Sequence, residues 1–360
     1  MIKYIGSKRL LAPRIVAAFQ ALPGVRSVAD PFSGTARVGH SLKRAGFEVH
    51  ASDYLRFAST LARCYIAADA AVWAEQARSL IADLQQVPPE PGYFTETFCQ
   101  RSRYFRPENG AKVDAIRERI ARLQLHPELE AIALVSLMEA ADRVDSTTGL
   151  QMAYLKDWAP RARNPLELRL PALLPGVGYA REGLAEEIAP QLDVNAAYLD
   201  PPYNQHSYLG NYHIWETLCR WDKPAFYGTA CKRLDVRTRR SRFNSKRQIR
   251  AALQQVLDGL RCPWIVASFS DEGYLARDEL IALLAPRGHV EVVPLDYKRY
   301  VGAQIGIHNH LGQRVGEVSH LRNTEYLFIA GPDGAAVERA TRAAGQPNGT
   351  DGLQVALPIS

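Results

Sequence analysis

Short hydrophobic runs that end in acidic or turn-forming residues recur along this chain of 360 residues. Six of them, at 25–29, 47–52, 194–199, 264–269, 290–295 and 324–329, have the length and composition of buried strands. Between several of these runs, apolar residues recur at the spacing of an amphipathic helix, as from Leu10 to Phe19. The alternation of strands and helices predicts an α/β fold built on an open sheet.

The middle of the chain is predicted to be mostly helical. An alanine-rich helical run from Leu55 to Gln86 stops at Val87-Pro88-Pro89-Glu90-Pro91-Gly92, which breaks a helix. Aromatic residues and arginines alternate beyond it, ahead of two helices predicted at 112–123 and 128–140. We expect most of these aromatics to form the core of a small helical subdomain, although the same mixture can stack on bases and contact phosphates.

Two segments lack a regular pattern. The polar run 142–149 follows an apolar helix and is either an active-site loop or a simple connection. The final stretch, 331–360, is rich in Gly, Ala, Asp and Pro, and we predict that it is a disordered tail.

Acidic residues stand at the ends of the first two predicted strands, which frame a βαβ unit. The first strand leads into Asp30-Pro31-Phe32-Ser33-Gly34-Thr35, and the second ends at Asp53, about 20 residues beyond the glycine turn. An acid at that distance meets ribose hydroxyls in nucleotide-binding folds. Because the turn lacks GxGxxG, it suits a nucleoside that carries no phosphate there, and S-adenosylmethionine meets that description.

The stretch Asp200-Pro201-Pro202-Tyr203-Asn204 directly follows the hydrophobic run 194–199. The prolines end the strand, so the Asp200 carboxylate lies where the backbone leaves the sheet, which is where open α/β sheets bind ligands. Asp200 and the proline-flanked carbonyls are hydrogen-bond acceptors, and Tyr203 supplies a flat face. Such a pocket fits an amine on a planar ring, although the same residues can simply end a strand and begin a turn.

The beginning of the chain combines a small loop with a predicted helix. Gly6 and Ser7 would let backbone amides and the Lys8 side chain approach an anionic or carboxylate-bearing ligand. The other interpretation is a basic, disordered start before a helix.

Composition narrows the class of protein. The hydrophobic content of 47% is enough for a substantial core, and the net charge of +6 with a pI of about 9.0 is compatible with a polyanionic partner. The five cysteines form no CxxC pair, so we expect reduced, buried thiols, and we expect no metal site because His206 and His213 lack further ligands at a suitable spacing. No apolar segment is long enough to span a membrane, so we expect a cytoplasmic protein.

The positive charge is concentrated downstream of Asp200. One acid, Asp235, stands among the basic residues of the segment 232–250, which are Lys232, Arg233, Arg237, Arg239, Arg240, Arg242, Lys246, Arg247 and Arg250. Beside a base pocket, we predict that the cluster contacts DNA phosphates, mainly through Lys232, Arg233, Arg237, Arg239, Arg240 and Arg242. The alternative is a solvated surface.

Taken together and in this order, the motifs resemble the D12 class of N6-adenine-specific DNA methyltransferases. The resemblance rests on Tyr4-x-Gly6-Ser7-Lys8, Asp30 to Thr35, Asp53, Asp200 to Asn204 and the following Asn211-Tyr212-His213-x-x-Glu216-Thr217, and covers about residues 1–330. It implies a Rossmann-like S-adenosylmethionine-dependent methyltransferase domain formed by 1–70 and 191–330. It also implies an inserted, mostly helical target-recognition region at 71–190, ahead of the predicted tail 331–360.

The resemblance also assigns roles to individual residues. The cofactor site is implied for Tyr4, Gly6, Lys8, Asp30, Phe32, Gly34, Thr35 and Asp53, and the catalytic motif that receives a flipped adenine for Asp200, Pro201, Pro202 and Tyr203. The turn departs from the family in one place, because Ala36 stands where glycine is frequent and adds a methyl group near the cofactor.

The expected reaction is methyl transfer from S-adenosylmethionine to N6 of adenine in a specific double-stranded DNA sequence. The sequence leaves open whether a companion restriction endonuclease accompanies the enzyme or whether it is an orphan or phage enzyme. Acceptors around the N6 amine would free its lone pair for direct attack on an activated methyl group, without a metal. The alternatives are N4-cytosine methylation, RNA adenine methylation, and a catalytically silent DNA-binding module on the same scaffold.

Overall fold

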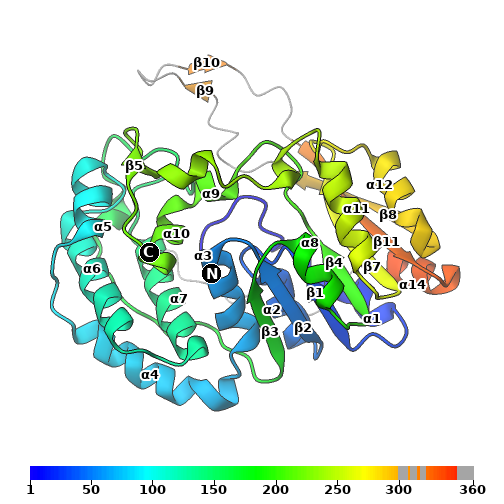
Figure 1. The fold of residues 1–360 in the computed structure, drawn as a ribbon, viewed down its shortest axis with the longest axis horizontal. Helices are drawn as coiled ribbons and strands as arrows, with labels where there is room; N and C mark the ends of the chain where they lie inside the picture. The colour runs from blue at the N-terminus through cyan, green and yellow to red at the C-terminus, as the bar shows by residue number, and fades with distance from the viewer. Residues whose placement is uncertain (299–306, 309–313, 317–321, 347–360) are drawn as a thin grey trace.

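A seven-stranded sheet forms the centre of the molecule (Figure 1). The computed structural model describes residues 1–298, 307–308, 314–316 and 322–346. In sheet order the strands are β3 (Gly178–Glu182), β2 (Glu48–Asp53), β1 (Ser27–Asp30), β4 (Ala196–Leu199), β7 (Trp264–Ser270), β11 (Arg322–Gly331) and β8 (His289–Lys298). Neighbouring strands are parallel except at β11, which is antiparallel to both β7 and β8. The described chain also contains two small two-stranded sheets, β5 (Phe226–Tyr227) with β6 (Lys232–Arg233), and β9 (Ile307–His308) with β10 (Arg314–Gly316).

Alternating side chains of the central strands enter two separate hydrophobic cores, because successive residues of a strand point to opposite faces of the sheet. Val28, Tyr198, Val266 and Leu327 belong to one core, and their neighbours Ala29, Leu199, Ala267 and Phe328 belong to the other. The sheet is therefore buried on both faces, as parallel sheets in α/β proteins usually are.

Helices cover both faces. The first core contains residues of α1 (Ala12–Ala21), α2 (Arg37–Arg44), α3 (Arg56–Ala62) and α14 (Gly334–Gly345). The second contains residues of α8 (Ala185–Ile188), α11 (Ile249–Gly259) and α12 (Arg277–Leu284). The fold is thus the three-layer, Rossmann-like α/β arrangement that the sequence predicts.

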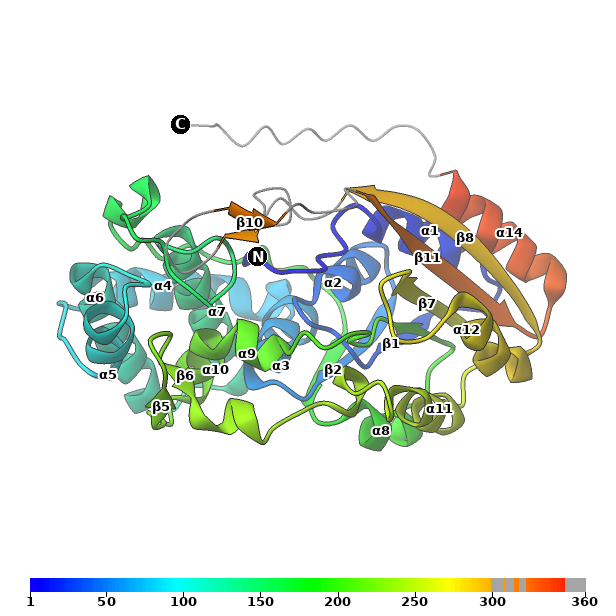
Figure 2. The same cartoon turned by 90° about the horizontal axis from the view of Figure 1, so that it is seen from above.

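A group of helices extends beyond the β3 edge of the sheet (Figures 1 and 2). We call it the helical lobe, and it comprises α4 (Ala70–Gln86), α5 (Tyr93–Thr95), α6 (Pro107–Arg122) and α7 (Pro127–Arg143). Between the lobe and the sheet lie the short helix α9 (Tyr208–Asn211) and α10 (His213–Arg220). Four aromatic residues in α5 and in the segment between α5 and α6 are buried, which confirms that most of the aromatics there form core: Phe94, Phe98, Tyr104 and Phe105.

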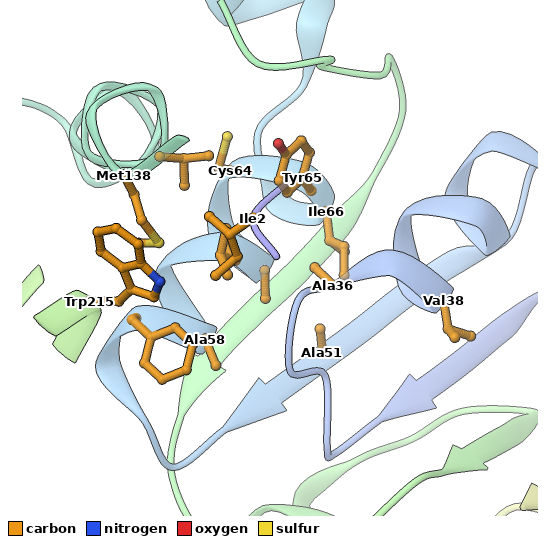
Figure 3. Packing of buried hydrophobic residues seen from close by; sticks show 14 of the residues in the cluster. Ile2, Ala36, Val38, Ala51, Ala58, Cys64, Tyr65, Ile66, Met138 and Trp215 are labelled. Carbon is orange, nitrogen blue, oxygen red and sulfur yellow. The ribbon is translucent and has the colours of Figure 1, made fainter. Parts of the chain in front are cut away.

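The helical lobe shares its core with the first face of the sheet. Met138 of α7 and Trp215 of α10 lie together beside Cys64 and Tyr65, which follow α3 (Figure 3). All four side chains are buried. Because the core is continuous, separating the lobe from the sheet would expose apolar surface.

The first ten residues connect the two parts. Lys3 Nζ lies 2.7 Å from an Asp145 carboxylate oxygen just beyond α7, and its backbone amide donates to Asp142. Lys8 Nζ, five residues later, lies 2.6 Å from Glu325 on β11. The run 142–149, for which a role as a loop or a connection was open, thus anchors the beginning of the chain.

The six predicted strands are confirmed, each to within a few residues, as β1, β2, β4, β7, β8 and β11. Strand β3 was not predicted and lies inside the region assigned to the insertion, although it pairs with β2 in the central sheet. Its sequence, Gly-Tyr-Ala-Arg-Glu, has no apolar alternation because it forms a largely exposed edge. The boundary at 190 is therefore wrong for this strand.

Two predicted segments need correction. The single helix expected from Leu55 to Gln86 is interrupted, because α3 passes into a π-helical turn and Asp69 caps a new helix, α4, by accepting from the amide of Ala71. The predicted tail contains α14, which packs beside α1 (Figure 2). Its buried stripe of Ala336, Val337, Ala340 and Ala344 has helical spacing and could have been recognised, while 347–360 lies outside the described residues.

Candidate active site

Three predicted acids meet at the carboxyl edge of the sheet. Asp30 is the last residue of β1, Asp53 is the last of β2, and Asp200 follows β4. The direction of winding changes between β1 and β4, and ligands of open α/β sheets bind at such a point. The fold thus brings together three acids that lie far apart in the sequence.

The three acids line one pocket of about 810 Å³. Every residue predicted to bind the cofactor lines it: Tyr4, Gly6, Lys8, Asp30, Phe32, Gly34, Thr35 and Asp53. Of the predicted catalytic motif, Asp200 and Pro202 line the pocket, whereas Pro201 and Tyr203 do not. Residues from the beginning of the chain, the first βαβ unit and the Asp200 stretch thus surround a common space.

The turn after β1 is tied to the end of β2. The Asp53 carboxylate accepts hydrogen bonds from the backbone amides of Gly34 and Leu55, at 3.1 and 3.0 Å. Gly34 has φ +49°, a left-handed conformation that glycine adopts without strain. Ala36 also has a left-handed backbone, with φ +60°, so the departure from glycine is accommodated at a backbone cost of about 1–2 kcal/mol.

Asp30 is a buried acid with an unused acceptor. Its side chain is 1% exposed, and its Oδ1 atom has no hydrogen-bond partner in the described part of the chain. Burial, with repulsion from Asp200 and Asp53, raises the pKa of Asp30 to about 8, although backbone amides of Phe32 and Gly39 oppose the shift. A cationic ligand group beside it would restore the charged carboxylate.

Burial likewise raises the pKa of Asp53 to about 7, against the effect of the amides that it accepts. The hydroxyl of Ser33, another residue of the lining, has no partner among the described residues. One unsatisfied buried carboxyl oxygen, of Asp30, and one hydroxyl, of Ser33, thus remain at the pocket for the polar groups of a ligand.

Asp200 is held from one side. Its Oδ1 atom lies 3.0 Å from Lys8 Nζ and accepts a 2.9 Å hydrogen bond from Ser268 Oγ. Burial raises the pKa of Asp200, while the Lys8 ammonium acts in the opposite direction. The carboxylate predicted from the sequence therefore stands at the pocket with its orientation fixed.

Aromatic rings pack behind the beginning of the chain. The ring of Tyr4 lies between those of Tyr208 and Tyr212, at centroid distances of 5.0 and 4.7 Å and nearly parallel. Tyr203 is half-buried, with its ring 6.4 Å from that of Phe269. Tyr4 is thus held by two tyrosine rings where it lines the pocket, and the predicted stacking role of Tyr203 stays a prediction.

Part of the pocket lining was not predicted. This part comprises Leu184 and Ala185, at the start of α8, together with Ser241 and Phe243. The rings of Phe243 and Phe32 meet edge to face at 4.9 Å. These residues belong to no motif, so a single sequence gave no signal for them.

The structure divides the predicted DNA-contacting residues into two groups. Arg233 is 3% exposed and forms ion pairs with Asp222 and Asp235, so its predicted contact with phosphate is wrong. Arg239 pairs with Glu216 and Asp235.

Arg242 pairs more loosely, with Glu186 at 3.5 Å. Lys232 is half-buried. Arg237 and Arg240 are exposed, and Arg237 lies over the ring of Tyr227 at 4.1 Å. Contact with phosphate thus stays a prediction for the more exposed members of the cluster, above all Arg237 and Arg240.

Other predictions concern groups outside the pocket. All five cysteines are free and buried, as expected. Within the described ranges, we find neither a cluster of three metal-ligating side chains nor a helix long and apolar enough to cross a membrane.

Comparison with known proteins gives matches along most of the chain. The chain is 27% identical over 336 residues to the Type II methyltransferase M.NlaIII of Neisseria lactamica, covering 89% of this chain and 98% of that protein. It is 28% identical over 324 residues to the Type II methyltransferase M.FokI of Planomicrobium okeanokoites, covering 83% of this chain and 50% of that protein. The modification methylase StsI of Streptococcus sanguinis is 26% identical over 320 residues, with coverages of 83% and 49%. The chain thus spans nearly all of the first relative and about half of the other two.

A model of the family of D12 class N6 adenine-specific DNA methyltransferases matches residues 4–280. This range contains the three acids, the beginning of the chain and the basic cluster, so the match covers the pocket as well as most of the fold. The chain belongs to the D12 class of N6 adenine-specific DNA methyltransferases.

Proposed function

We propose that the enzyme transfers a methyl group from S-adenosylmethionine to N6 of an adenine flipped out of a specific double-stranded DNA sequence. The observation that carries the proposal is the meeting of Asp30, Asp53 and Asp200 with Lys8 at one pocket on the carboxyl edge of the sheet. The names of the relatives support a Type II modification system, in which a companion endonuclease would cut the same unmethylated sequence. A DNA substrate agrees with the predicted cytoplasmic location.

The cofactor site follows from the unused polar groups of the pocket. Asp30 and the turn to Thr35 would hold the amino acid end of S-adenosylmethionine, and Asp53 would accept from its ribose hydroxyls. When bound, S-adenosylmethionine supplies a methyl group already activated on a sulfonium. The protein therefore has to position the acceptor nitrogen rather than activate the methyl group.

Asp200 would prepare the acceptor nitrogen. By accepting an N6 hydrogen, with the carbonyls of the proline motif as further acceptors, it favours a pyramidal amine whose lone pair is free. The freed lone pair of N6 would then accept the methyl group that the bound cofactor supplies, with S-adenosylhomocysteine as the leaving group, and the N6 proton would pass to Asp200 or water. Extrusion of the base costs a few kcal/mol, and stacking on Tyr203, worth about 1–3 kcal/mol, would offset much of it.

The proposal is tested by incubating the enzyme with tritiated S-adenosylmethionine and DNA, followed by nucleoside analysis. We expect label in N6-methyladenine. Label in N4-methylcytosine, or transfer to RNA alone, would replace the proposed substrate, and no transfer to any nucleic acid would favour a silent binding module.

Substitution of Asp200 by Ala tests the assignment of the site. We expect the variant to bind S-adenosylmethionine in calorimetry but to transfer methyl groups roughly 10³-fold more slowly, within the range for loss of a proton-accepting group. Asp278→Ala, at an exposed acid on α12, is the matched control and should behave as wild type. Normal turnover by Asp200→Ala would move the chemistry away from this residue.

A further inference from the structure

A chain of buried polar side chains surrounds Asp200 beyond the predicted motifs. Lys8 Nζ lies between two carboxylates, 3.0 Å from Asp200 Oδ1 and 2.6 Å from Glu325 Oε1. Ser268 Oγ donates to Asp200 Oδ1, and the Tyr198 hydroxyl lies 2.7 Å from Ser268 Oγ. The proposed reaction gives no role to Glu325, Ser268 or Tyr198.

The sheet brings these groups together from three strands. Tyr198 precedes Asp200 by two residues, Ser268 lies on β7 and Glu325 on β11, and all three point to the face covered by α1. Glu325 pairs in register with Ser270, at the carboxyl end of β7. The antiparallel strand β11 thus places a second carboxylate within reach of the Lys8 ammonium, in addition to that of Asp200.

The two carboxylate oxygens of Asp200 differ in their contacts. Both Lys8 and Ser268 contact Oδ1. Neither of these contacts uses Oδ2, so this oxygen can accept from an amine in the pocket. The carboxylate is fixed through one oxygen and available through the other.

Lys8 by itself would fix Asp200 at an electrostatic disadvantage. An ammonium ion-paired with Asp200 alone would cancel its charge, yet N6 becomes positive as the methyl group is transferred, and the sulfonium is already positive. With Glu325 on the other side of Lys8, one ammonium faces two carboxylates and the group keeps a net negative charge. Fixed charge of the opposite sign stabilises a developing cation, most of all where water is excluded.

We propose that Glu325 is a positioning residue for methyl transfer: it shares the Lys8 ammonium with Asp200, so that Lys8 orients Asp200 without neutralising the site. Ser268, supported by Tyr198, completes the orientation by donating to the same oxygen. The inference rests on the proposed function, since it takes Asp200 as the acceptor of the adenine amine. Glu325 lies beyond the family match, which ends at residue 280.

Glu325→Gln is the main test, because it removes the charge and keeps the shape. We expect the single-turnover rate at saturating DNA and S-adenosylmethionine to fall roughly 10- to 100-fold, with cofactor affinity changed much less. Glu118→Gln is the matched control. Glu118 belongs to the remote helix α6, and its carboxylate lies 2.6 Å from Lys223 Nζ. This variant therefore also removes a carboxylate from a Lys–Glu pair. Glu325→Asp, which keeps the charge, should recover part of the rate.

The pH profile separates positioning from mere stability. The titratable groups that act on Asp200 are Lys8, which lowers its pKa, and Glu325, which raises it, while the Ser268 hydroxyl lowers it. Tyr198, Tyr203 and Asp30 also lie within electrostatic range. If the reaction needs ionised Asp200, Glu325→Gln should shift the acid limb of the single-turnover rate to lower pH. Ser268→Ala removes a donor to Asp200 and should shift the limb to higher pH, with a smaller loss of rate.

The outcomes are distinct. Opposite shifts of the acid limb in the two variants support the inference. If Glu325→Gln does not fold, Glu325→Asp carries the test: its shorter side chain should weaken the contact with Lys8 and lower the rate, and a wild-type rate would overturn the inference. A wild-type rate and profile in Glu325→Gln would overturn it. A slower Glu325→Gln with an unmoved acid limb and a lower melting temperature would overturn it too, because the residue would then serve only stability. Full activity of Asp200→Ala would instead refute the proposed role of Asp200.

Discussion

The rim of the pocket and the basic segment 232–250 are both rich in charge, yet they differ in how that charge is satisfied. At the rim, the buried Oδ1 of Asp30 lacks a partner among the described residues. In the basic segment, Arg233 and Arg239 are occupied by Asp222, Asp235 and Glu216. The carboxylates around Arg233 and Arg239 thus satisfy these two side chains within the protein, whereas Asp30 keeps an oxygen that a ligand could use.

The difference also concerns the cost of each arrangement. Ionising an unpaired buried carboxyl costs free energy, and burial raises the pKa of Asp30 to about 8. Asp30 therefore stays protonated in the folded protein at neutral pH. A buried arginine has no such option, because it stays charged and must be paired wherever the chain encloses it. This predicts opposite results of mutation in the two regions.

Removal of the buried arginine should have the largest effect on stability. Arg233→Ala should lower the free energy of unfolding by about 3 kcal/mol, at the lower end for a broken buried pair because Asp222 is partly exposed. Urea unfolding at neutral pH measures the change. Arg240→Ala, at an exposed position seven residues later, is the control and should stay within about 0.5 kcal/mol of wild type. Equal losses of unfolding free energy in the two variants would contradict the distinction between the paired, buried Arg233 and the exposed Arg240.

Cofactor binding should reveal the protonated acid at the rim. Because burial raises the pKa of Asp30 to about 8, and that of Asp53 to about 7, a cationic ligand should expel protons from the site near neutral pH. Affinity for S-adenosylmethionine should therefore rise with pH, by at most about tenfold per pH unit for each proton released, and level off above about pH 8. Calorimetry in two buffers of different ionisation enthalpy measures the release.

Asp30→Asn is the matched variant, since it keeps the shape and cannot ionise. It should release fewer protons and bind the cofactor with a flatter pH dependence. The sign also applies to the free protein. The pKa of Asp30 is raised from an ordinary 3.8 to about 8, so between these two pH values the folded state keeps a proton that the unfolded chain has lost. The contribution of Asp30 to stability therefore falls as the pH rises through this range. Identical heats in both buffers for wild type would contradict this account.

The smallest expected effect belongs to the exposed arginines. Arg237→Ala combined with Arg240→Ala should reduce the slope of log affinity for DNA against log salt by about 1.8, since each phosphate contact contributes about 0.9. Stability should be unchanged, apart from the loss of the contact between Arg237 and Tyr227. Fluorescence anisotropy at several salt concentrations provides the slopes. An unaltered slope would mean that these two arginines do not contact DNA phosphates.

The fold was predictable as far as it depends on buried strands. Six strands are recognised by their apolar runs. Strand β3 has no such run, because its side chains are largely exposed at the edge of the sheet. The missed helix α14 carried a signal in the spacing of its small buried residues. The break before α4 depended on a cap at Asp69, which an alanine-rich pattern conceals.

The site was predictable where residues stand at the ends of strands. Asp30, Asp53 and Asp200 converge because parallel strands bring their carboxyl ends together. The sequence could not assign partners, so Arg233 looked like a phosphate ligand until its carboxylates were located. Glu325 was hidden for the same reason, since an acid within an apolar strand acquires meaning only from Lys8, 317 residues away.

That long separation has a consequence for how the enzyme is made. At a synthesis rate of about 5–20 residues per second, roughly 15–60 s pass between the translation of Lys8 and that of Glu325. A ribosome-bound chain that has reached residue 280 contains every recognised motif, but it still lacks the antiparallel strand β11. Nascent or truncated chains would then resemble the family in full while carrying an unbalanced Lys8, and methylation would begin only on release of a nearly complete polypeptide.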